Sequence, residues 1–142
     1  MISTDELASE IETDKESLLK FFLLFSKIEY LAKKYNCFNR KLHYPKTDLA
    51  AFAKKTKIDF LQKELMEAVR YLNENAPHKE TVQNGKIEWE ETNPKDICAI
   101  LNTVRNNLFH GGKYSSGPRS NKGLVHHSII ILEYWLQKLG NK

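Results

Sequence analysis

An arginine and a histidine lie five positions apart near the end of the chain, in the run Val-Arg-Asn-Asn-Leu-Phe-His-Gly-Gly-Lys that covers residues 104–113. The planar guanidinium of Arg105 has five N–H donors and suits an anionic oxygen group such as a phosphate. The imidazole of His110 is the side chain whose pKa lies nearest neutrality, so it can take up and release a proton. The pair therefore marks the stretch of the chain where chemistry is most plausible.

The spacing of the pair does not suit a single regular helix. Apolar residues recur at helical intervals as Ile97, Ile100, Leu101, Val104 and Leu108. At about 100° per residue, Arg105 falls about 80° from Ile97, at the edge of this stripe, and His110 falls about 140° from Arg105. Two arrangements would bring the pair together: Gly111 and Gly112 end the helix and let the ring turn, or a twofold axis joins two chains.

Each residue of the pair also has a purely structural interpretation. Arg105 at the edge of an apolar stripe needs a counter-charge, and Glu29 on the first long helix is the expected partner. His110 would then be a histidine stabilised by the dipole at the end of its helix. On the residues alone, this structural interpretation stays open beside the chemical one.

The motif Arg-Asn-Asn-Leu-Phe-His-Gly resembles the R-x4–6-H motif that defines the HEPN superfamily, including the polar Asn106 directly after the arginine. Residues 21–34, with Ile28-Glu29-Tyr30, also resemble the first helix of that family. The resemblance covers most of the chain in layout and is specific at residues 104–113. It implies an all-α, HEPN-like bundle of about five helices in a single domain, residues 1–142.

The resemblance implies metal-independent endoribonuclease activity of the toxin or phage-defence kind, started by attack of an RNA 2′-OH on the adjacent phosphate. His110 would move protons, Arg105 would hold the phosphate and stabilise its charge, and Asn106 would orient the imidazole ring or the phosphate. A homodimer would form the cleft, and an antitoxin or defence-system protein would be a further partner. Some toxins of the superfamily carry a modified tyrosine two residues after the histidine. That position here is Gly112, and Tyr114 is the nearest tyrosine.

Two other functions remain open on the sequence. Some HEPN members do not cleave RNA, so a non-catalytic module for dimerisation or for binding RNA or protein is the main alternative. A structural helical domain with an incidental motif is the other. No Gly-rich phosphate loop and no cluster with metal-ligand spacing is evident, so we expect neither a cofactor nor a bound metal.

The charge distribution favours a nucleic-acid partner. The chain carries a formal charge of +4, and residues 94–142 hold seven basic against two acidic residues, whereas residues 1–93 hold fifteen against sixteen. The positive excess therefore lies in the last third. Lys113, Arg119 and Lys122, in and beside the loop after the motif, are the candidates to contact RNA phosphates, and a solvated loop explains them equally well.

The remaining elements are predicted from periodicity and turn residues. One helical segment is expected from about Thr4 to Cys37, with a possible second helix start at Thr13-Asp14. Further helices are expected over residues 49–55, from Lys57 or Asp59 to residue 72, from Asn93-Pro94 to His110, and over residues 124–139. Residues 36–46 are predicted to form a loop. Asn84-Gly85 indicates a possible small hairpin insertion around residues 81–89. The apolar run Ile129 to Leu132 suggests deep burial or an interface.

The compartment follows from cysteine usage and hydropathy. Cys37 and Cys98 lie far apart and give no disulfide framework, which favours a reducing cytoplasm. The N-terminus lacks the pattern of a secretion signal. The most apolar early run, Leu18 to Phe25, is broken by Lys20 and is too short for a bilayer, so we expect no membrane association.

Overall fold

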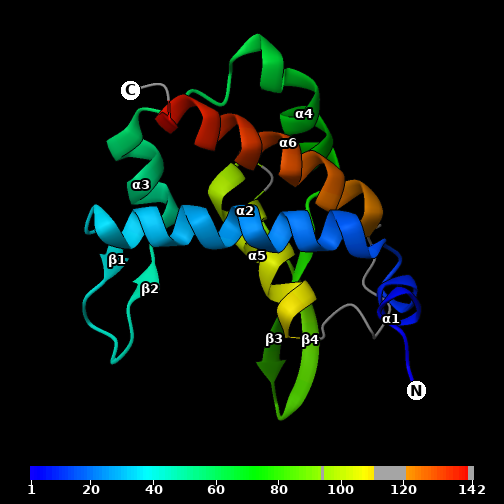
Figure 1. Ribbon diagram of the computed structural model, residues 1–142. Coiled ribbons are helices and arrows are strands. Elements are labelled where there is room, and N and C mark those ends of the chain that lie inside the picture. Colours follow the sequence, from blue (N-terminus) through cyan, green and yellow to red (C-terminus); the bar gives the residue numbers. More distant parts are fainter. Residues whose placement is uncertain (94, 111–120, 141–142) are drawn as a thin grey trace.

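The fold is mixed α/β, so the expectation of an all-α bundle is wrong. The structure, a computed structural model, describes residues 1–93, 95–110 and 121–140. Within these ranges the chain forms six α-helices, a short 3-10 helix and two small antiparallel sheets of two strands each (Figure 1). The bounds are α1 Thr4–Glu10, α2 Lys15–Lys34, β1 Phe38–Asn39, β2 Lys46–Thr47, α3 Leu49–Thr56, η1 Lys63–Leu65, α4 Met66–Glu74, β3 His78–Gln83, β4 Lys86–Glu91, α5 Ile97–Phe109 and α6 Asn121–Gly140.

The first predicted helical segment is two helices. Ser3 caps α1 through its hydroxyl, and Asp14 caps α2 by accepting a hydrogen bond from the backbone N–H of Ser17. Because this N–H donates to the Asp14 carboxylate, the pKa of Asp14 is held below its usual value. The residues between the caps include Glu12, whose positive φ of 55° breaks the helical path.

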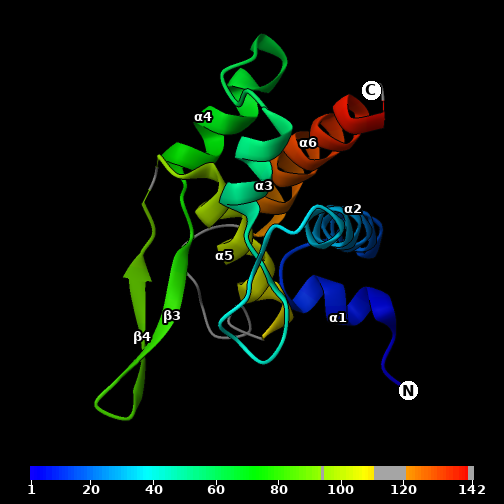
Figure 2. The same ribbon diagram turned by 90° about the vertical axis from the view of Figure 1, so that its left-hand side faces the viewer.

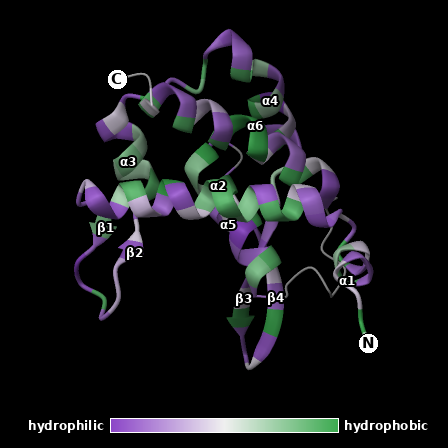
Figure 3. Cartoon of the chain, viewed as in Figure 1, coloured by the Kyte–Doolittle hydropathy of each residue, from purple (hydrophilic) through white to green (hydrophobic). Residues whose placement is uncertain are grey.

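The core lies where α2 and α6 cross and where α3, α4 and α5 pack against them (Figure 1). One face of α2 is buried through Phe21, Phe25, Ile28 and Ala32. Trp135 on α6 is fully buried, stacks on Phe52 of α3 with ring centroids 5.3 Å apart, and donates through Nε1 to Thr56 Oγ1 at 3.0 Å. Figure 3 shows hydrophobic and hydrophilic residues alternating along α2, as expected for a helix that buries only one face.

The segment predicted as a loop over residues 36–46 contains paired strands. Phe38 pairs with Thr47 and Asn39 pairs with Lys46, while the Cys37 carbonyl accepts a hydrogen bond from the backbone N–H of Asp48 at 3.0 Å. Strands of two residues are too short to produce the alternation by which strands are recognised in a sequence. Tertiary anchoring of the two ends, not local propensity, therefore forms this sheet.

The possible hairpin is present and is longer than the sequence indicated. Strands β3 and β4 pair over six residues each, from His78↔Glu91 to Gln83↔Lys86, and Asn84 and Gly85 both have positive φ in the turn between them. The hairpin extends away from the helices (Figure 2). Because most of its side chains are exposed on both faces, the sequence there lacks the buried alternation of a core strand.

The start of α4 also differs from the prediction. The helix begins at Met66, after η1, and not at Lys57 or Asp59. Lys57 has a positive φ of 56° and ends α3, and the Asp59 carboxylate accepts a hydrogen bond from the Leu61 N–H to form a local turn. A side chain suited to capping a helix here stabilises a turn instead.

Candidate functional site

Helix α5 carries the motif and is fixed at both of its ends. Its N-cap is Asp96, which accepts a hydrogen bond from the Ala99 N–H at 3.0 Å, so the predicted cap at Asn93 is wrong and Pro94 lies outside the described residues. Its last helical residue is Phe109, and His110 is the C-cap, with its N–H donating to the Asn106 carbonyl at 2.9 Å. Arg105 to Phe109 therefore lie in the last turns of α5, and His110 directly follows them.

The expected contact between Arg105 and Glu29 is present. Arg105 Nε donates to Glu29 Oε1 at 3.1 Å, across the interface of α5 with α2. A second bond runs from a terminal guanidinium nitrogen of Arg105 to Asn106 Oδ1, also at 3.1 Å. The Arg105 and Glu29 side chains are 29% and 21% exposed, so the pair is sheltered but open to a ligand.

A pocket of about 250 Å³ lies directly over this pair. Its walls come from two helices: Phe22, Phe25, Ser26 and Glu29 on α2, and Arg105 and Phe109 on α5. Two of the five N–H donors of Arg105 are used in the bonds to Glu29 and Asn106. Arg105 lines the pocket, so its remaining N–H donors are available to an anionic group that enters it.

His110 and Arg105 both contact Phe109 but share no hydrogen bond with each other. The Arg105 guanidinium lies over the Phe109 ring, 5.1 Å from its centroid, and the His110 ring meets the same Phe109 ring edge-on at 5.5 Å. Phe109 is 65% exposed, and His110 is exposed as well. The two candidate groups thus contact the same exposed aromatic ring at the end of α5.

Asn107 was missed in the sequence and has a clear structural role. Its side chain is 5% exposed, and its amide Nδ2 donates to the His78 carbonyl at 2.8 Å. This bond joins the motif turn of α5 to the first residue of the hairpin. A polar residue among the apolar positions of an amphipathic helix was the available signal, because such a residue must find a partner when it is buried.

The expected phosphate-contacting residues do not all gather at this pocket. Lys113 and Arg119 lie outside the described residues, as does Tyr114. Lys122 is exposed on the first turn of α6, where it lines a separate pocket with Thr13, Asp14 and Ser17. That pocket is at the start of α2, about 20 Å along the helix from Glu29, so Lys122 does not lie beside Arg105.

The apolar run on α6 is mainly core and not surface. Ile131 and Leu132 are fully buried, and only Ile130 of the four residues is exposed, at 37%. The observation that suggested an interface on α6 is therefore explained by packing within one chain. Exposed apolar surface occurs instead on Phe109 at the end of α5 and on Leu19 and Leu23 of α2.

Cys98 and Cys37 are both free and buried in the structure. Burial raises the pKa of the Cys98 thiol to about 12, and the nearby carboxylates of Asp96 and Asp48 add to the rise. Among the described residues, no group of three or more His, Cys, Asp or Glu side chains is placed to hold a metal ion. No helix in that part of the chain has both the length and the apolar character needed to cross a membrane.

The site is thus a pocket between α2 and α5 in which a guanidinium is held by a carboxylate and an amide, beside an exposed aromatic ring and an exposed imidazole. The guanidinium could bind a phosphate group, while His110 lies outside the residues that line the pocket. Comparisons with known proteins add no relative to this description: no family model, no curated protein and no solved structure matches the chain.

Proposed function

We propose that this chain is a HEPN-like endoribonuclease of toxin or phage-defence type that cleaves RNA without a metal ion. The observation that supports the proposal most is the pocket over Arg105, whose guanidinium is held by Glu29 and Asn106 and keeps free N–H donors. His110, the C-cap of the same helix, contacts Phe109 in the wall of that pocket. Because Glu29 and Asn106 already hold the Arg105 guanidinium, the side chain loses little further conformational entropy when a phosphate binds.

The reaction needs only groups of this chain and of the substrate. The RNA 2′-oxygen attacks the neighbouring phosphorus while His110 accepts the 2′-hydroxyl proton. The bond from phosphorus to the 5′-oxygen breaks, and the leaving oxygen takes a proton from solvent. The products are a 2′,3′-cyclic phosphate and a free 5′-hydroxyl. Arg105 stabilises the negative charge that builds on the phosphate oxygens, and Asn106 orients Arg105.

The site is proposed to act in a homodimer in the cytoplasm. Phe109 is 65% exposed beside Arg105, and a second copy packed on it would cover an apolar ring and enclose the pocket. The two free, buried cysteines support a reducing compartment. An antitoxin or defence-system protein that silences the site remains part of the proposal. If light scattering at micromolar concentration detects only a monomer, the proposed homodimer is contradicted.

The test is cleavage of a labelled single-stranded RNA in excess EDTA. His110→Ala should lower the rate about 10²- to 10⁴-fold, the usual contribution of a proton-transferring group. Arg105→Lys keeps the charge but loses the planar fork, and should lower the rate about 10²-fold or more. DNA of the same sequence should stay intact because it lacks the 2′-hydroxyl.

The matched control is His126→Ala, an exposed histidine on α6 outside the pocket over Arg105. This variant should cut RNA at the parent rate. Loss of cutting in EDTA, or equal rates for the parent and His110→Ala, would contradict the mechanism. Circular dichroism of each variant verifies that the fold persists.

A non-catalytic module that dimerises or binds RNA or protein is the second candidate, and one observation favours it. The Glu29 carboxylate already compensates the Arg105 charge, so a single chain does not leave this guanidinium as an unpaired cation for catalysis. If the parent protein binds RNA but never cuts it, the non-catalytic module is the function that the result supports.

A further inference from the structure

Positive charge is concentrated at the end of the molecule where α2 and α3 finish. The comparison of residues 1–93 with residues 94–142 did not reveal it. Residues 30–58 contain eight basic residues and a single acidic one, Asp48. Their net charge of +7 exceeds the +4 of the whole chain. Acidic residues before and after this segment cancel it in a count over residues 1–93.

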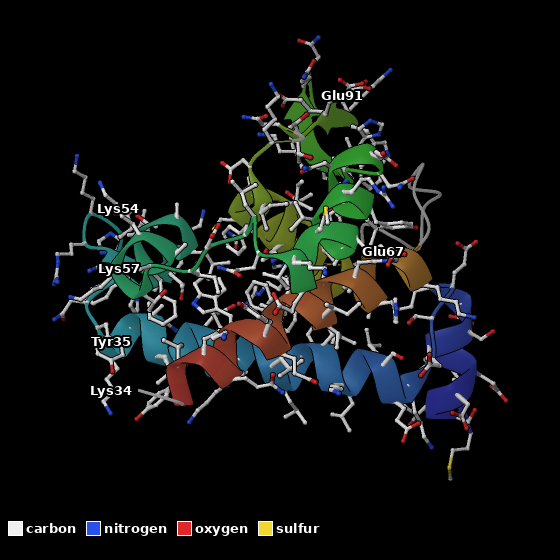
Figure 4. All side chains as sticks on the ribbon, turned by 90° about the horizontal axis from the view of Figure 1, so that it is seen from above. Lys34, Tyr35, Lys54, Lys57, Glu67 and Glu91 are labelled. Carbon is white, nitrogen blue, oxygen red and sulfur yellow. The ribbon has the colours of Figure 1, made fainter. Side chains whose placement is uncertain are left out.

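The fold gathers five of these lysines at the adjoining ends of two helices. Lys33 and Lys34 form the last turn of α2, Lys54 and Lys55 belong to the last turn of α3, and Lys57 follows directly. Lys55 Nζ donates to the Tyr35 carbonyl at 3.2 Å and so ties the two helix ends together. Figure 4 shows Lys34, Tyr35, Lys54 and Lys57 at one end of the molecule. We name these five lysines the basic end.

The charges of the basic end are exposed and uncompensated. All five lysines are exposed, and within the described residues none of them has a carboxylate within ion-pairing distance. Asp48, the acidic residue of the segment, is used as the N-cap of α3. The helix dipoles stabilise cations at these ends by about 0.3–1 kcal/mol each, but only within the last turn. Lys57 lies beyond that turn, so the dipoles do not explain the whole cluster.

The basic end is continuous with the candidate pocket along α2. Glu29, which holds Arg105, and Lys33 are four residues apart, so they share one face of the helix and lie about 6 Å apart along its axis. Tyr35, 45% exposed, adds an aromatic side chain beside the lysines. Lysines with an adjacent aromatic ring are typical of surfaces that bind single-stranded nucleic acid through phosphates and stacked bases.

We propose that the basic end binds the phosphate backbone of single-stranded RNA and directs the strand along α2 to the pocket over Arg105. This inference rests on the proposed function in taking RNA as the polyanion. It adds a binding surface that α2 and α3 build together from residues other than Lys113, Arg119 and Lys122.

The experiment measures RNA affinity without cleavage. Each protein carries His110→Ala, EDTA is present, and binding of a fluorescent single-stranded RNA is followed by anisotropy at several salt concentrations. The combined variant Lys34→Gln, Lys54→Gln, Lys57→Gln should bind about tenfold more weakly at low salt. The slope of log Kd against log salt should fall by about two, since each lysine that neutralises a phosphate of a single strand adds about 0.7 to it.

The matched control removes the same charge elsewhere. Lys79, Lys86 and Lys95 are exposed and lie on or after the hairpin, and their combined change to Gln should alter the affinity less than about threefold. Equal weakening in both variants would overturn the inference, because net charge and not the basic end would then set the affinity. Circular dichroism is expected to be the same for both variants.

The remaining outcomes separate this inference from the proposed function. If the basic-end variant binds RNA as well as its parent, the inference fails, whether or not the protein with His110 restored cuts RNA. If RNA binds through the basic end but the protein with His110 never cuts it, the inference stands and the ribonuclease fails. If the protein binds vesicles of acidic lipid but no RNA, the inference is overturned in favour of a membrane surface.

Discussion

At the scale of single residues, the site depends on the competition for Arg105. Its guanidinium is shared among Glu29, Asn106 and the ring of Phe109. A phosphate entering the pocket would be a further partner for the donors that these contacts leave free. Glu29 therefore has two opposite effects: it fixes the guanidinium in place, and it lowers the positive charge that a phosphate meets.

Replacing Glu29 tests the structural part of this role. Glu29→Gln should lower the free energy of unfolding by about 1 kcal/mol, because a sheltered guanidinium loses its counter-charge. Equilibrium unfolding in urea measures this loss of stability. Glu133→Gln removes a more exposed carboxylate, which pairs with Lys20 at 2.6 Å, and should cost less than about 0.5 kcal/mol. If both changes had the same effect, Glu29 would have no special role in holding α5 to α2.

Cys98 gives a prediction about pH. Its pKa of about 12 in the folded protein lies above the value of about 8.5 for an unfolded cysteine. The folded state therefore keeps a proton that the unfolded state releases. Its contribution to stability is complete below about pH 8.5 and is lost as the pH rises towards 12. At about pH 8, near the unfolded thiol pKa, iodoacetamide should leave Cys98 unmodified in the native protein and modify it in urea, as mass spectrometry of peptides would show. Rapid modification of the native thiol would contradict this burial.

At the scale of elements, α5 links the pocket to the rest of the molecule. Asp96 fixes its start, Asn107 joins it to β3, and Arg105 joins it to α2. Because the motif lies in the last turns of this helix, a change at its start should affect stability more than the geometry of the pocket.

Removing the cap of α5 tests this separation. Asp96→Ala leaves the Ala99 N–H without its partner and should cost about 1 kcal/mol, lowering Tm by roughly 3–6 °C. Asp59→Ala is the control, because Asp59 accepts a hydrogen bond in an exposed turn and caps no helix, so its effect should be smaller. Differential scanning calorimetry gives both values. A larger loss for Asp59→Ala would show that α5 does not depend on its cap.

At the scale of the whole molecule, a helical core carries two β additions of different character. The sheet of β1 and β2 lies beside the end of α2 and directly before the start of α3 (Figure 1), whereas the β3–β4 hairpin extends away from the core (Figure 2). The hairpin has mainly exposed side chains, and Val82 and Ile87 at its outer end are 76% and 65% exposed. The core should therefore be independent of most of the hairpin.

Shortening the hairpin tests this independence. Replacing residues 80–89 by Gly-Gly keeps His78, whose carbonyl accepts from Asn107, and Thr92, whose hydroxyl donates to the Pro77 carbonyl at 2.8 Å. The variant should stay helical by circular dichroism and unfold cooperatively in urea. A gradual, non-cooperative transition would show that the hairpin contributes to the core.

The sequence by itself determined the helices whose apolar residues follow the helical period and whose caps are local. The helical period predicted the helical segment that ends near Cys37 and the short helix over residues 49–55, because this signal acts over a few residues. The charge of Arg105 at the edge of an apolar stripe also predicted its contact with Glu29. A sheltered guanidinium needs a carboxylate, and α2 offered one.

Only the tertiary structure decided the features that depend on residues far apart in the chain. The pairing of Phe38 with Thr47 leaves no periodic pattern, so the loop predicted there, and with it the all-α fold, was wrong. The basic end exists because α2 and α3 finish side by side, and a count along the chain cancelled its charge against distant acidic residues. A local sequence pattern reflects the backbone preference of its residues and the spacing of those that are buried. Charge and packing instead depend on which residues lie close together in space.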